Sequence, residues 1–154
     1  MIQRIQTIYL AIATFLLVLV FSNPIAQLIV NDSLFLTQWH HKIVAISPEL
    51  FTPYSTWPVT VLLSVIVLLQ LFAIFLFKKR QLQIRLCIFS ILLLVGLTGL
   101  IYFFTYSTLS GLDGKKSVIL WPFICPLIAA VLNFLALKAI QKDDNLVRSY
   151  DRIR

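Results

Sequence analysis

The sequence has few charged residues, which make up 12% of its 154 positions, whereas hydrophobic residues make up 60%. A water-soluble domain has about twice that share of charged residues. The shortage of charge therefore excludes an ordinary soluble domain and indicates a surface that contacts lipid. A membrane-spanning helix needs about 20 apolar residues, so four spans leave no room for a second large domain.

Four long apolar runs, without the strict alternation of a membrane β-strand, predict an all-α membrane protein built as a four-helix transmembrane bundle. We place the spans at about residues 6–24, 57–77, 84–106 and 117–140, in a single domain that covers residues 1–154. The first run resembles a secretory signal. However, Pro24 would stand at the –3 position of a cleavage after Ala26, and the run is long for a signal, so we expect a retained anchor.

Basic residues are unevenly divided between the two sides of the predicted bundle. Ten of the 13 Lys and Arg residues lie on the side that holds both termini and the short connection between spans two and three. Positive charge favours the cytoplasmic side of a membrane. We therefore expect a multi-pass protein of the bacterial cytoplasmic (inner) membrane with both termini in the cytoplasm. The same cations predict contact with anionic headgroups, and no nucleic-acid-binding motif is present.

Residues 25–56 are expected to form a small extracytoplasmic cap between the first two spans. Leu34 and Leu36 alternate with other residues, and residues 42–46 are rich in β-branched side chains, which favours a short β-hairpin. At the other end, residues 141–154 carry apolar residues at helical spacing with cations on the remaining faces. This pattern predicts a basic amphipathic C-terminal helix, which could lie on the membrane or continue span four into the cytoplasm.

The sequence has few residues that could form a catalytic, redox or metal-binding site. The only cysteines, Cys87 and Cys125, are predicted at different depths, so neither a disulfide nor thiol redox chemistry is expected. His40 and His41 are the only histidines, and neighbouring side chains point in different directions, which makes a poor chelate. No nucleophile motif or phosphate-binding loop is present. We therefore expect no enzyme activity, no cofactor and no metal site, with metal sensing by the two histidines as an alternative.

Three sets of residues are candidates for contact with other molecules. The first set would bind a partner protein or lipid headgroups on the cytoplasmic side: Lys78, Lys79, Arg80, Arg85, Arg148, Arg152 and Arg154. The second set would line a cleft opened by two proline kinks on span four: Pro122, Pro126 and Asn133. The third set would form an outer contact on the cap: Trp39, His40 and His41. Ordinary packing and interfacial solvation compete with each of these interpretations.

Small and neutral polar residues within the spans favour helix packing over a pore, since no Asp, Glu or His is placed inside a span. We expect Gly96, Gly99 and Ser90 to let neighbouring helices approach each other. We expect Asn133 to donate a hydrogen bond between helices.

Three segments carry a family resemblance. They are the opening Met-Ile-Gln-Arg-Ile-Gln-Thr-Ile-Tyr-Leu, the connection Phe-Lys-Lys-Arg-Gln-Leu-Gln-Ile-Arg-Leu-Cys at residues 77–87, and the close Lys-Ala-Ile-Gln-Lys-Asp-Asp-Asn-Leu-Val-Arg-Ser-Tyr-Asp-Arg-Ile-Arg. Together they resemble the bacterial four-span membrane family catalogued as domain of unknown function 4293. The resemblance covers the whole chain and implies a four-helix inner-membrane protein. It implies no activity, substrate or catalytic residue.

The sequence thus favours a non-catalytic accessory or assembly subunit of a larger cytoplasmic-membrane protein complex. Such a subunit would contact a membrane-protein partner through its basic connection and tail, and through its aromatic cap. The alternative is a small transporter, or a lipid- or quinone-binding protein, that uses the cleft near the fourth helix.

Overall fold

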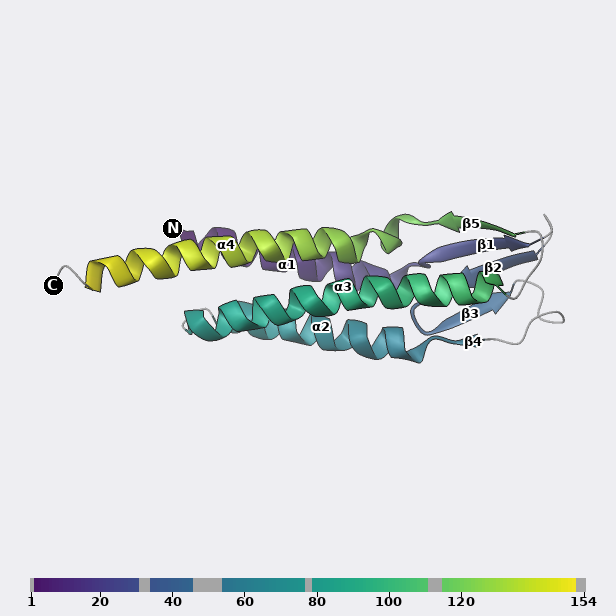
Figure 1. The fold of residues 1–154 in the computed structure, drawn as a ribbon, viewed down its shortest axis with the longest axis horizontal. Coiled ribbons are helices and arrows are strands. Elements are labelled where there is room, and N and C mark those ends of the chain that lie inside the picture. Colours follow the sequence, from purple (N-terminus) through teal and green to yellow (C-terminus); the bar gives the residue numbers. More distant parts are fainter. Residues whose placement is uncertain (1, 31–33, 46–53, 77–78, 111–114, 152–154) are drawn as a thin grey trace.

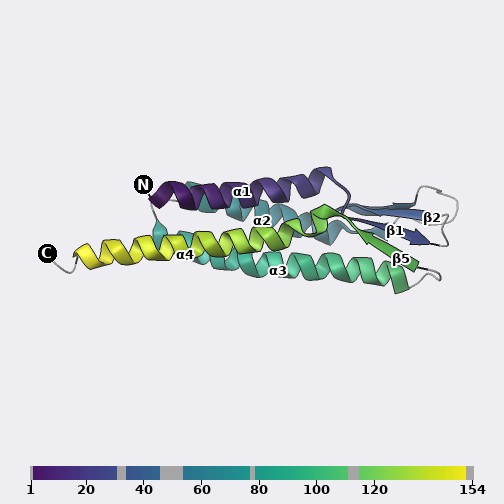
Figure 2. The ribbon, with the colours of Figure 1, turned by 90° about the horizontal axis from the view of Figure 1, so that it is seen from above.

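The computed structural model of the protein describes residues 2–30, 34–45, 54–76, 79–110 and 115–151. Within these ranges, four long helices run side by side, and a five-stranded antiparallel sheet extends from one end of the bundle (Figures 1 and 2). We call this the sheet end. The opposite end, where α1 begins and α4 finishes, is called the tail end.

The helices are α1 (Ile2–Ser22), α2 (Trp57–Phe75), α3 (Arg80–Ser110) and α4 (Cys125–Asp151). Each holds an apolar segment long enough to cross a bilayer, namely Ile5–Ser22, Trp57–Phe75, Arg80–Thr108 and Trp121–Asp144. The chain is therefore a multi-pass membrane protein with four candidate spans, and the predicted fold class is confirmed. Continuous apolar runs form helices here because only a helix satisfies its own backbone hydrogen bonds in lipid.

The four helices form a square arrangement. Helix α1 packs against α4 and α2, and α3 packs against the same two helices. It follows that α2 and α4 lie diagonally across the bundle from each other. The polar side chains that these two helices turn inward therefore meet the centre of the bundle rather than lipid.

The cap is larger than the predicted hairpin. Its strands are β1 (Ala26–Val30), β2 (Leu34–Gln38), β3 (Lys42–Ala45), β4 (Tyr54–Ser55) and β5 (Lys115–Ile119), in the spatial order β4-β3-β2-β1-β5. The segment between α3 and α4 thus supplies the fifth strand. Strand β5 pairs with the edge of β1, where Ala26 lies opposite Ile119 and Val30 lies opposite Lys115.

The fourth helix begins later than the predicted residue 117. Residues 115–119 are extended, a short 3₁₀ helix, η1 (Trp121–Phe123), follows, and α4 starts at Cys125. The backbone of β5 is satisfied by β1, so it does not need to be helical. Pro122 and Pro126 fall within the first residues of η1 and α4, where a missing N–H costs least. They therefore start helices and do not kink the interior of a span.

Helix α3 reaches past the other helices to cover one face of the sheet. With 31 residues it is about 46 Å long, which exceeds the ~30 Å hydrocarbon layer. Ala26 and Ile43 pair with Gln38 in the sheet, and all three side chains are buried. The Thr105 hydroxyl of α3 donates a 2.7 Å hydrogen bond to Gln38 Oε1, which fixes the sheet to the helix.

The predicted C-terminal helix is the continuation of α4. The helix runs without a break from Cys125 to Asp151, and its last turns extend beyond the other three helices at the tail end (Figure 1). The sequence left open whether this segment lies on the membrane or continues span four. The structure shows the second arrangement, because the segment is part of α4. Residues 152–154 lie outside the described residues.

Candidate functional site

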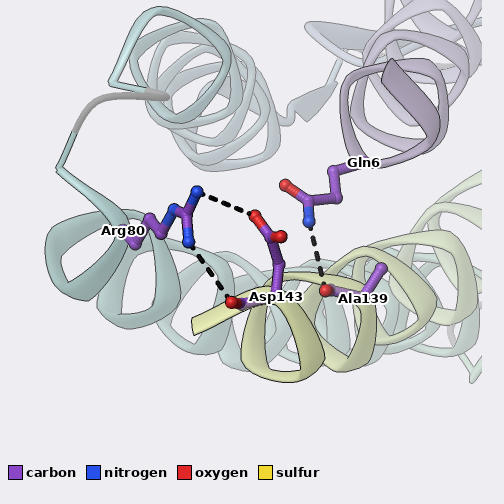
Figure 3. A network of polar contacts seen from close by, with 4 residues as sticks. All are labelled: Gln6, Arg80, Ala139 and Asp143. Atoms are coloured by element: carbon purple, nitrogen blue, oxygen red, sulfur yellow. Dashed lines mark hydrogen bonds and ion pairs between the residues drawn. The ribbon is translucent and has the colours of Figure 1, made fainter. Parts of the chain in front are cut away.

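The tail end is joined by polar contacts between three helices (Figure 3). Arg80, the first residue of α3, makes a 3.1 Å ion pair with the carboxylate of Asp143 on α4. Its second guanidinium nitrogen donates to the Asp143 backbone oxygen at 3.2 Å. From α1, Gln6 Nε2 donates to the Ala139 backbone oxygen at 3.1 Å. These bonds clamp α4 between α1 and α3 just before it leaves the bundle.

A shallow hollow lies beside this clamp. Its volume is about 460 Å³, and it is lined by Lys79, Arg80, Gln81, Leu82 and Asp144. Gln81 Nε2 donates a 2.9 Å hydrogen bond to Asp144 Oδ2 across it. The hollow is mixed in charge and open to the surroundings, so it suits a polar headgroup or a protein side chain better than an enclosed substrate.

The predicted basic residues are only partly placed by the structure. Lys79 and Arg85 are exposed at the tail end, and Arg80 is half-buried in its ion pair. Arg148 lies on the projecting part of α4, where only the backbone is described. Lys78, Arg152 and Arg154 fall outside the described residues. The described cations therefore gather where α3 begins, close to the projecting helix.

The predicted cleft residues are all inside the molecule. Pro122, Pro126 and Asn133 are buried, whereas a groove open to lipid would expose them. Asn133 was expected to donate a hydrogen bond between helices. Instead, neither its Nδ2 nor its Oδ1 has a hydrogen-bond partner among the described residues.

The predicted outer residues lie at the junction between sheet and bundle. His40 and His41 form the turn between β2 and β3, closed by a 2.9 Å bond from Trp39 N to Lys42 O. The His40 backbone oxygen accepts hydrogen bonds from the hydroxyls of Thr56 at 3.1 Å and Thr60 at 3.0 Å. This turn therefore fixes the sheet to the start of α2.

The two imidazoles of this turn are in contact. The ring centroids of His40 and His41 are 4.6 Å apart, and Phe21 of α1 meets His40 edge-on at 5.1 Å. Burial, and secondly the charge of His41, lower the pKa of His40 from its ordinary value of 6.5. Within the described residues no group of three or more His, Cys, Asp and Glu side chains is placed to hold a metal ion.

The cysteines lie at different depths, as predicted. Both are free and buried; Cys87 packs in a cluster toward the tail end and Cys125 in one toward the sheet end. Each fills space as a small apolar side chain.

Gly96 and Gly99 do not let the helices of this chain approach each other, contrary to the prediction. Both are exposed, and a Cβ atom added to either would meet nothing within 4 Å. They lie on a strip that we call the outer face of α3. It consists of Leu92, Val95, Gly96, Gly99, Phe103 and Tyr106, all exposed. The prediction failed because α3 is apolar around its whole circumference, which hides the face that turns inward.

Two polar positions were not singled out from the sequence. Gln70 of α2 is 1% exposed, and its Oε1 accepts a 3.0 Å hydrogen bond from the Thr14 hydroxyl of α1. Asp143 of α4 supplies both acceptors for Arg80. A signal for Gln70 was present, because a glutamine in the middle of an apolar span has to find a partner inside the bundle.

Comparison with known proteins agrees with this architecture. A family model described as "domain of unknown function (DUF4293)" matches residues 2–153, nearly the whole chain. None of the curated proteins compared with the chain matches it. The chain therefore belongs to the DUF4293 family of four-span membrane proteins.

Proposed function

We propose that this protein is a non-catalytic accessory or assembly subunit of a larger complex in the bacterial cytoplasmic membrane. The outer face of α3 is the observation that carries the proposal. In this account a transmembrane helix of a partner protein packs along that face, against Gly96 and Gly99.

Glycine inside a helix costs about 1 kcal/mol relative to alanine. Within the part of the chain that the structure describes, no packing offsets that cost at Gly96 and Gly99, because a Cβ atom added there would meet nothing within 4 Å. Helices in lipid associate through close van der Waals contact, and small residues allow this contact. A partner helix outside this chain accounts for two glycines on an exposed face.

The tail end offers a second surface. There the last turns of α4 project beyond the bundle (Figure 1), and Lys79 and Arg85 are exposed. By the positive-inside rule this end faces the cytoplasm, where its cations also contact anionic headgroups. In the proposed complex, the clamp between Arg80 and Asp143 holds α4 in position for a cytoplasmic part of the partner.

The proposal is tested by adding a side chain to the outer face of α3. We expect Gly99→Leu to leave helix content and the unfolding midpoint unchanged or slightly raised, and to abolish co-migration with the complex on a native gel of mild-detergent membranes. The matched control is Val65→Phe, which adds bulk to the exposed face of α2 and should co-migrate as the wild type does. Unchanged co-migration of Gly99→Leu would contradict the proposal.

A second candidate function is a small transporter or a lipid- or quinone-binding protein. The buried Asn133 amide and Gln70 Nε2 have no hydrogen-bond partner among the described residues, and this favours it, because such groups in a membrane often contact a polar ligand. A stoichiometric small molecule extracted from the purified protein, and lost in Asn133→Leu, would support this function. A ligand-free wild type would exclude it.

A further inference from the structure

Each of the four helices buries a polar side chain within its membrane-spanning segment, at the boundary between two hydrophobic clusters of the bundle. These residues are Thr14 of α1, Gln70 of α2, Ser90 of α3 and Asn133 of α4, and none is more than 8% exposed. None of the four side chains carries a charge. We call this set the polar layer.

The polar layer separates two hydrophobic clusters. The tail-end cluster consists of Leu10, Ala73, Cys87, Ala136, Leu137 and Ile140. The sheet-end cluster includes Leu17, Ile66, Leu94 and Ala129.

The order along each helix places the polar layer between the clusters. On α2, Gln70 stands between Ile66 and Ala73. On α4, Asn133 stands between Ala129 and Ala136. Spacings of three and four residues keep these side chains on the inward face. Ser90 and Thr14 occupy the equivalent places on α3 and α1, so the four residues share one depth.

Some polar atoms of this layer have hydrogen-bond partners among the described residues and others do not. The Ser90 hydroxyl donates within its own helix to the Cys87 oxygen at 2.9 Å, and the Thr14 hydroxyl reaches the Leu10 oxygen and Gln70 Oε1. Gln70 Nε2 and both polar atoms of the Asn133 amide have no partner among the described residues. Exchanging the two ends of the Gln70 amide would satisfy its nitrogen with Thr14 and leave its oxygen alone. Either orientation therefore leaves both amides short of partners.

The chemistry of the unpaired atoms limits what can bind. Asn133 offers two N–H donors and one acceptor oxygen, and Gln70 offers donors in the observed orientation. A bare ion is disfavoured, because the four side chains carry no charge and Asn133 Oδ1 is the one oxygen among them without a hydrogen-bond partner within the described residues. The carbonyl of a quinone or lipid could accept from the amides, but it would leave Asn133 Oδ1 without a donor. Water both donates and accepts hydrogen bonds, and it is small enough to lie inside the bundle beside the Asn133 and Gln70 side chains, which are only 0–1% exposed.

We propose that the polar layer is a buried hydration site in which ordered water bridges Asn133 and Gln70. These two residues belong to the diagonal pair of helices, so water in the centre of the bundle lies between them. The water satisfies Gln70 Nε2 and the Asn133 amide, which have no partner among the described residues. It links α2 to α4, which pack mainly against α1 and α3 and little against each other. The inference does not depend on the proposed partner complex.

Water-edited solid-state NMR of the labelled full-length protein in lipid bilayers tests this directly. We expect magnetisation to pass from water protons to the side-chain amides of Asn133 and Gln70. Leu63 and Leu97, buried in the sheet-end cluster, serve as dry controls and should receive none at the same mixing time. Transfer to Asn133 no faster than to Leu97 would overturn the proposal, and so would contacts of Asn133 with lipid or a co-purified molecule in place of water.

A double-mutant cycle gives an independent readout. With bridging water, Asn133→Leu and Gln70→Leu should each lower the unfolding midpoint, and their combination should lower it by less than the sum. In Asn133→Leu the water signal of Gln70 should also weaken. If the layer is dry, Asn133→Leu removes a buried amide that has no partner among the described residues and should raise the midpoint, and the effects of the two substitutions should simply add. That result would overturn the proposal.

Discussion

Arg80 at the start of α3 holds Asp143 of α4 through both the carboxylate and the backbone oxygen, at 3.1 and 3.2 Å. The chain positions of the two residues are 63 apart. This contact joins the first residue of α3 to α4 at the tail end (Figure 3).

Removal of the Arg80 guanidinium should loosen the end of α4. The Arg80 and Asp143 side chains are 25% and 15% exposed, so we expect Arg80→Gln to cost about 1 kcal/mol of stability. Hydrogen exchange of residues 141–151 should become faster, while exchange in the centre of α4 stays unchanged. Arg85→Gln, at an exposed position on the same helix, is the control. Equal exchange in the two variants would show that the clamp does not order the tail.

The bond between Thr105 and Gln38 should contribute measurably to stability, because both side chains are buried. Thr105→Val leaves Gln38 Oε1 without its donor, and Gln38 Nε2 already has no partner among the described residues. We expect a loss of about 1–3 kcal/mol in the free energy of unfolding.

Thr98→Val is the matched control for this prediction. Among the described residues, the Thr98 hydroxyl donates to the Leu94 oxygen of its own helix, at 2.9 Å, so its loss should change stability little. Similar destabilisation by the two variants would mean that the contact between sheet and helix is not what Thr105 contributes.

Acidification should weaken the junction between sheet and bundle. The pKa of His40 is lowered in the folded protein, chiefly by burial, so the folded state favours the neutral imidazole. Stability is fully present above the unfolded pKa of about 6.5 and falls as the pH drops toward the lower folded pKa. We therefore expect the unfolding midpoint to decrease between neutral and mildly acidic pH.

Substitution at His40 isolates this effect. His40→Phe keeps a ring against Phe21 and should flatten the pH dependence in that window. His41→Phe retains the titrating His40 and should keep a decrease, of smaller size because one neighbouring charge is gone. A wild-type slope in His40→Phe would assign the pH dependence to other groups.

The proposed orientation predicts opposite labelling of the two ends. Lys142 on α4 and Lys42 at the start of β3 are both exposed, and they lie at the tail end and the sheet end. With a membrane-impermeant maleimide on intact spheroplasts, Lys42→Cys should react and Lys142→Cys should react only after lysis. The reverse pattern would place the tail end outside the cytoplasm.

The number and type of helices could be predicted because a continuous apolar run of about 20 residues has few alternatives in lipid. Strand β5 could not, because Ser117, Val118 and Ile119 join an apolar stretch that reads equally well as the start of a helix. Its structure depends on the free edge of β1, which lies about 90 residues away in the chain. Pairing over such a distance leaves no local pattern.

The candidate sites were harder to predict than the spans. In a soluble helix the polar face shows which side is outside, but the α3 sequence is apolar on every side, so the outward position of Gly96 and Gly99 was hidden. The burial of Asn133 was predictable from its depth. Its missing hydrogen bonds were not, because they depend on which side chains face it across the bundle.

The account is tested most directly by photo-crosslinking in native membranes. A photoreactive amino acid at Val95, on the outer face of α3, is compared with one at Val65 on α2. Both positions are exposed, and each directly adjoins a buried residue of the sheet-end cluster in the sequence. We predict one discrete protein adduct from Val95 and only lipid adducts from Val65, with the Val95 adduct lost in Gly99→Leu. Lipid adducts alone at both positions would contradict the claim that a partner helix packs on α3.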